Sequence, residues 1–140
     1  MKSITVFTSN QPRHLGLIHE LSKVSDKVYA IIESNTVHPG KIEGFFKKSS
    51  IMQNYFSNVL KSEKRFFGNL SFLPTNVTPL IVKMGDLSLI DLSILKDCFQ
   101  SDLFVVFGSS YIKGELIDFL VKQKAINIHM GVSPYYRGSS

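Results

Sequence analysis

The sequence predicts an α/β fold with a doubly wound, mostly parallel sheet, because short apolar strand patterns alternate with helical ones along its 140 residues. Hydrophobic residues make up 44% of the chain and charged residues 19%, so one domain can bury a substantial core. No stretch reaches the roughly 18 to 20 apolar residues of a membrane span, and the opening MKSITVFTSN lacks the basic-then-apolar pattern of a signal peptide. We therefore expect a cytoplasmic protein without membrane association.

The first third of the chain predicts a strand, a helix and a second strand. Residues 4–8 are β-branched and apolar and precede turn-forming residues, whereas apolar residues recur at helical spacing over 15–24. Residues 28–32 form an apolar run typical of a strand covered on both faces. A right-handed crossover makes the two strands parallel.

The middle of the chain predicts a basic amphipathic helix within residues 41–68, with a break near Ser49 and Ser50. We expect this helix to pack on the core with a solvated basic face, rather than to contact a membrane surface or RNA. Residues 77–82 predict an edge strand, since Pro79 cannot donate a hydrogen bond to a central ladder.

The last third predicts two further strand and helix pairs. A helix is expected over residues 90–98, with Cys98 as a small core residue rather than a nucleophile. Residues 102–108 form the strongest strand pattern, 115–121 a helix and 125–131 the last strand. The only cysteine of the chain cannot form an intramolecular disulfide, in agreement with a reducing compartment.

In such a sheet, ligands bind beyond the carboxyl ends of the strands, which here selects residues 9–14, 108–113 and 127–138. The first of these turns has no glycine, so it does not favour dinucleotide binding, although Glu33 falls where a ribose-binding acid would lie. Asn10, Arg13 and the helix N-terminus could still hold a smaller anion such as a phosphate. The alternative for Arg13 and His14 is a solvated helix start.

The last turn carries the strongest chemical signal, because Asn127 and His129 lie two residues apart and would share one face of a strand. An amide can donate to a developing oxyanion, and an imidazole can donate to it or move a proton. Acyl transfer to an amine requires this pair of functions.

The run NIHMGVSPYYRG, residues 127–138, resembles the N-x-H, turn-proline and basic-glycine signature of the folate-dependent formyltransferases. This family includes methionyl-tRNA formyltransferase, glycinamide ribonucleotide transformylase and the amino-sugar N-formyltransferases. Residues 102–108 and the following loop, 109–113, resemble the strand and folate-side loop that precede this signature. The resemblance implies a Rossmann-like formyltransferase fold that is incomplete at its C-terminus.

The resemblance also implies an enzyme that transfers a formyl group from 10-formyltetrahydrofolate to a substrate amine. Asn127 and His129 would stabilise the tetrahedral intermediate, and Ser110, Tyr111 and Ile112 would line the folate pocket. The aspartate that orients the histidine in this family would lie beyond Ser140. We therefore expect residues 1–140 to be the N-terminal portion of one catalytic domain, catalytically incomplete alone.

For the acceptor we expect an amino sugar on a nucleotide carrier, or a related small amine, bound with the help of Asn10 and Arg13. The first turn lacks the glycines that the purine enzyme uses for its phosphate, and the linker and C-terminal domain associated with the tRNA enzyme are absent. Transfer RNA stays open as an acceptor, and a non-catalytic binding or interaction module is the alternative from another class. The four histidines show no paired ligand spacing, so we expect no metal.

Overall fold

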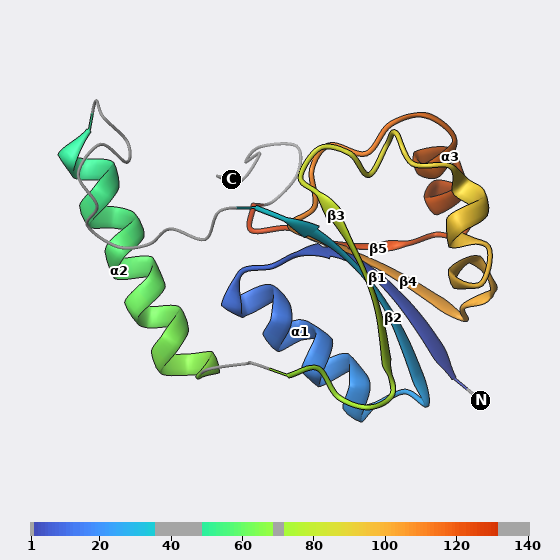
Figure 1. Ribbon diagram of the computed structural model, residues 1–140, viewed down its shortest axis with the longest axis horizontal. Coiled ribbons are helices and arrows are strands. Elements are labelled where there is room, and N and C mark those ends of the chain that lie inside the picture. The colour runs from blue at the N-terminus through green and yellow to red at the C-terminus, as the bar shows by residue number, and fades with distance from the viewer. Residues whose placement is uncertain (1, 36–48, 69–71, 132–140) are drawn as a thin grey trace.

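A computed structural model describes residues 2–35, 49–68 and 72–131 of the chain (Figure 1). Its strands form one five-stranded sheet in the order β3-β2-β1-β4-β5, and every neighbouring pair is parallel. The predicted α/β, doubly wound and Rossmann-like architecture is thereby confirmed. The strands are β1 (Ser3–Ser9), β2 (Lys27–Ser34), β3 (Val77–Lys83), β4 (Leu103–Phe107) and β5 (Ile126–Ile128).

Helix α1 (Pro12–Lys23) covers one face of the sheet (Figure 1). Pro12 occupies its first turn, where a missing N–H costs nothing. Ile18 of α1 is fully buried against apolar side chains from the strands. The other members of this cluster are Ile4, Val6, Val28, Ala30, Ile32, Val77 and Val105.

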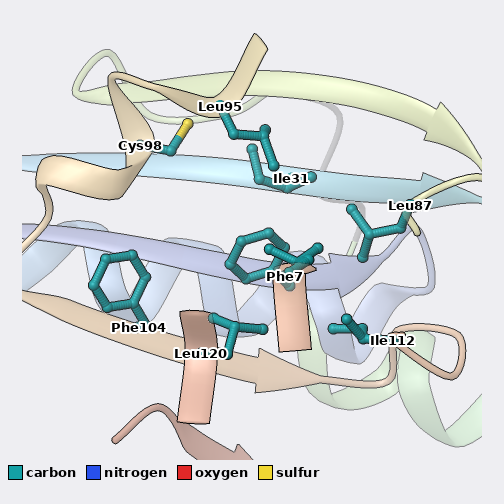
Figure 2. Close-up of a cluster of buried hydrophobic side chains, with 9 residues drawn as sticks. Phe7, Ile31, Leu87, Leu95, Cys98, Phe104, Ile112 and Leu120 are labelled. Carbon is teal, nitrogen blue, oxygen red and sulfur yellow. The ribbon is translucent and has the colours of Figure 1, made fainter. Parts of the chain in front are cut away.

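Helix α3 (Gly114–Lys122) and the segment between β3 and β4 cover the opposite face (Figure 1). Phe7 of β1 and Ile31 of β2 point into this second core, as Figure 2 shows. Around them pack Leu87, Leu95, Cys98, Phe104, Ile112, Leu116 and Leu120. Cys98 is buried among these side chains, which confirms its prediction as a core residue.

The helix predicted over residues 90–98 is wrong: two short 3₁₀ helices, η1 (Leu92–Leu95) and η2 (Cys98–Gln100), take its place. Asp91 accepts a hydrogen bond from the backbone N–H of Ser93 at 2.9 Å and so starts η1. Leu92, Leu95 and Cys98 follow one another at steps of three, which match the three residues per turn of a 3₁₀ helix.

Helix α2 (Ser50–Phe67) lies beside α1 and away from the sheet (Figure 1). The Oγ atom of Ser49 accepts a hydrogen bond from Met52 N and caps its N-terminus, near the predicted break. The predicted core packing of this helix is only partly correct, because Ile51 and Phe66 are 78% and 79% exposed. Residues 41–48 of the predicted helix lie outside the described residues.

Two contacts join α2 to α1. The Arg13 guanidinium forms an ion pair with Glu63, and the Phe67 ring lies over Gly16. The carboxylate of Glu63 is buried in this contact. The C-terminal end of α2 is therefore the part that is fixed to the domain.

Strand β3 pairs only with β2 in the described sheet, so Pro79 lies on an edge strand as predicted. The edge position lets Pro79 sit opposite Ala30 without breaking a ladder on its other side. Among the described helices, none is both long and apolar enough to cross a membrane.

Replacing Gly16 tests the α1–α2 contact. A Cβ atom at this position would lie 2.6 Å from Cδ1 of Phe67, closer than the ring can tolerate. An alanine inside a helix normally stabilises it over glycine by about 1 kcal/mol. We predict that Gly16→Ala raises the unfolding free energy by this amount when Phe67 is also replaced by alanine, but not when Phe67 is present. A double-mutant cycle of unfolding free energies measures the difference. Equal effects in both backgrounds would contradict the contact.

Candidate active site

All five strands end at the same edge of the sheet because they are parallel (Figure 1). The strand order reverses between β1 and β4, so the loops that follow these two strands flank the switch point, where ligands bind in open α/β sheets. These loops are residues 10–11 and 108–113. Both belong to the segments that the sequence selected.

Glu33, near the end of β2, ties the loops at this edge together. Its side chain is fully buried and accepts three hydrogen bonds. The donors are the backbone N–H of Gly85 at 2.9 Å, the backbone N–H of Ser110 at 2.5 Å and the Ser110 hydroxyl at 2.7 Å. The β4–α3 loop is thus bonded to β2, across the end of β1.

These bonds exclude the role that the sequence suggested for Glu33. A ribose-binding acid must present its carboxylate to the ligand, whereas this carboxylate is shielded from solvent and bonded to the chain's own groups. With no glycine in the β1–α1 turn either, the structure does not support dinucleotide binding at this edge.

The three residues predicted to line the folate pocket have different surroundings. Ser110 is bonded to Glu33, and Ile112 is buried in the core beside Leu87. Tyr111 between them is 82% exposed, with the Lys113 ammonium 5.5 Å from its ring centroid. The loop is therefore anchored on both sides of an aromatic ring that faces solvent.

Asn127 and His129 both lie at the carboxyl end of β5 and are exposed. The prediction that they share one face of a strand is wrong for His129, because β5 ends at Ile128 and is shorter than the predicted 125–131. Strand β5 ends at Ile128 because this residue pairs with Phe107, the last residue of β4. After Phe107 the chain turns away from β5 at Gly108, which has a φ of +69°. His129 begins the loop beside Gly108.

A turn holds the imidazole of His129. Its Nδ1 atom lies 3.2 Å from both the backbone nitrogen and the backbone oxygen of Gly131. The Nε2 atom is then the ring nitrogen that an incoming group can reach. The side-chain amide of Asn127 has no hydrogen-bond partner among the described residues, so it is also available. Residues 132–138 of the signature lie outside the described residues.

The two predicted phosphate-binding residues are bonded to the protein itself. The Asn10 amide donates to the backbone oxygen of Asn35 at 2.8 Å and accepts from the Asn35 backbone N–H at 3.1 Å. Arg13 forms its ion pair with Glu63. A phosphate at the start of α1 would therefore compete with existing partners.

His14 is the residue of this edge that the sequence reading placed wrongly, as part of a solvated helix start. It is 2% exposed, packs edge-on against Phe107 with ring centroids 4.8 Å apart, and neither ring nitrogen has a hydrogen-bond partner. Burial, and secondarily the charge of Arg13, lowers the pKa of His14 from 6.5 to about 4. Its spacing of four residues from buried Ile18 was the signal for this position.

Gly108 is required by the same packing. A Cβ atom on Gly108 would lie 2.2 Å from Nε2 of His14. The absence of a side chain lets the β4–α3 loop pass directly over the imidazole.

Within the described ranges, no three His, Cys, Asp or Glu side chains gather where they could hold a metal ion. No family model, curated protein sequence or solved structure matches the chain.

The buried imidazole predicts a pH dependence of stability. Because the folded state holds His14 neutral while the unfolded state protonates it, stability falls as the pH drops from the unfolded pKa of 6.5 towards about 4. Between about pH 7.5 and about pH 4.5, the unfolding free energy of the wild type should fall by roughly 2 kcal/mol more than that of His14→Leu. Urea denaturation of both proteins measures this difference.

The two proteins should show parallel pH dependence from about pH 7.5 to about pH 9, since the imidazole is then neutral in both states. An identical loss in the wild type and in His14→Leu on acidification would contradict a buried neutral His14.

Proposed function

We propose that this protein takes part in transfer of a formyl group from 10-formyltetrahydrofolate to a substrate amine. The observation that carries the proposal is the position of Asn127 and His129 at the carboxyl end of β5, beside the loop that follows β4. An amide and an imidazole nitrogen are both accessible there, at the edge where open α/β sheets bind ligands. The resemblance of residues 102–138 to the folate-dependent formyltransferases supplies the reaction.

The donor would provide a formyl carbon that the amine nitrogen attacks. A C–N bond forms to the amine, the bond between the formyl carbon and N10 of the folate breaks, and the proton lost by the amine is balanced by one gained at N10. The Asn127 amide donates a hydrogen bond to the developing oxyanion. His129 donates from Nε2 to the same oxygen, while Gly131 holds its Nδ1.

In this proposal the β4–α3 loop lines the donor site. Its exposed Tyr111 ring and the backbone between Ser110 and Ile112 present one flat apolar surface and several polar groups, which suits a planar heterocycle. The aspartate that the resemblance implies as a third catalytic residue has no counterpart within residues 1–140. The assays below use the full-length gene product.

For the acceptor we propose an amino sugar on a nucleotide carrier or a related small amine. A nucleotide brings phosphates, and the start of α1 offers a helix N-terminus with no acidic residue in its first turn. Asn10 and Arg13 would bind such a phosphate by exchanging their present partners for it.

The proposal predicts that the full-length gene product formylates a nucleotide-linked amino sugar, seen as a mass increase of one CO. Asn127→Ala and His129→Asn should each lower kcat by about 10² to 10⁴, the range for losing an oxyanion donor or a proton-transfer group. His19→Asn, the same substitution on α1 outside the site, should keep the wild-type rate.

Formylation of initiator methionyl-tRNA without any amino-sugar product would contradict the proposed acceptor. Absence of donor binding by the wild type, with His129→Ala indistinguishable from it in every assay, would instead favour a non-catalytic binding module.

A further inference from the structure

The Glu33 carboxylate, which the proposed chemistry does not use, forms a hydrogen-bonded cluster with Ser110 and Gly85. Each of its three partners is a hydrogen-bond donor, so the carboxyl group acts only as an acceptor. Burying a carboxylate is costly unless hydrogen bonds replace its hydration. Glu33 can therefore be buried at this position only because it accepts these hydrogen bonds.

The partners come from two loops that are far apart in sequence. Gly85 follows β3, and Ser110 lies in the β4–α3 loop, 77 residues after Glu33. Two more contacts join the same loops: the backbone N–H of Lys113 donates to the Ser88 hydroxyl at 2.9 Å, and Ile112 packs with Leu87 (Figure 2). The β4–α3 loop is thus fixed at three successive points.

Ser110 is the first of these points and the one closest to the end of β4. Gly108, two residues earlier, has a backbone conformation that side chains disfavour. Tyr111, the next residue, is exposed. The bonds from Glu33 therefore decide the direction in which the loop leaves the strand and where the Tyr111 backbone lies.

We infer that Glu33 is a positioning residue: it holds the β4–α3 loop, through Ser110, in the conformation that receives the formyl donor. This inference rests on the proposed function, because it takes that loop as the donor site. Glu33 contacts neither donor nor acceptor. Glu33 keeps the β4–α3 loop, one side of the proposed donor site, in its binding conformation before the donor arrives. The donor therefore does not have to order this loop on binding.

The experiment measures donor KM, acceptor KM and kcat for the full-length gene product. Glu33→Gln replaces an acceptor oxygen with an NH₂ group that faces donors, and so releases the loop. If only about one tenth of the molecules then hold the loop in the conformation that binds the donor, the donor KM rises about tenfold. Acceptor KM and kcat at saturating donor should stay within about twofold of the wild type.

Ser110→Ala is the milder second variant, because it removes one of the three bonds and leaves both backbone donors in place. Its donor KM should rise about threefold, and Ser110→Thr, which keeps the hydroxyl, should restore it. Ser101→Ala is the matched control. It also removes one hydroxyl hydrogen bond, to Thr5 Oγ1 at 2.8 Å, but at the opposite end of β4, and donor KM should not change.

Hydrogen exchange at the amides of residues 108–113 separates the possible failures. Faster exchange in Glu33→Gln with an unchanged donor KM would overturn the inference and leave the proposed function in place. An equal rise of donor and acceptor KM in Ser101→Ala and Ser110→Ala would also overturn it, as a general loss of stability. A wild type without formyl transfer has no donor KM and overturns the proposed function together with this inference.

Discussion

A buried carboxylate, Glu33, holds together the loops at the carboxyl edge of the sheet. Charge-assisted hydrogen bonds contribute about 1.5 to 3 kcal/mol each, and the buried Glu33 carboxylate accepts three hydrogen bonds from two loops. Five parallel strands end at this edge, and the chain must turn back after each of them. Without an acceptor at Glu33, the Ser110 and Gly85 N–H groups would lose the partner that joins their loops to β2. The path of the β4–α3 loop depends on this interaction, and so does the candidate site that we propose beside β5.

The local pattern of apolar and turn-forming residues was sufficient to predict most of the fold. Apolar runs identified all five strands, and Pro79 identified an edge strand, because these signals depend on residues within one element. The helix prediction for residues 90–98 was wrong because apolar spacings of three and of four residues are hard to tell apart over nine residues. This difference in spacing distinguishes a 3₁₀ helix from an α-helix. The exposed face of α2 could not be foreseen, because a hydrophobic pattern predicts an apolar face but not the partner that covers it.

The position of the candidate site residues in the sheet could be predicted from the sequence, whereas their local geometry could not. Asn127 and His129 were placed at the correct edge, but the length of β5 depends on where β4 ends, which is a property of the pairing strand. Glu33 resembled a ribose-binding acid in sequence, and only a contact 77 residues away shows its structural use. A solvated helix start was one alternative for His14, but its neighbours Phe107 and Gly108 leave it buried and neutral. In each case long-range packing decided the outcome.

We propose that the loop after β4 and the pair Asn127 and His129 form one formyl-transfer site. A crystal structure of the full-length gene product with a stable 10-formyl folate analogue tests it most directly. We expect the heterocycle against the backbone of residues 110–112 and the formyl oxygen within hydrogen-bonding distance, about 2.7 to 3.2 Å, of the Asn127 amide and His129 Nε2. An analogue bound at the β1–α1 turn or elsewhere, with these two side chains turned away from it, would contradict the claim.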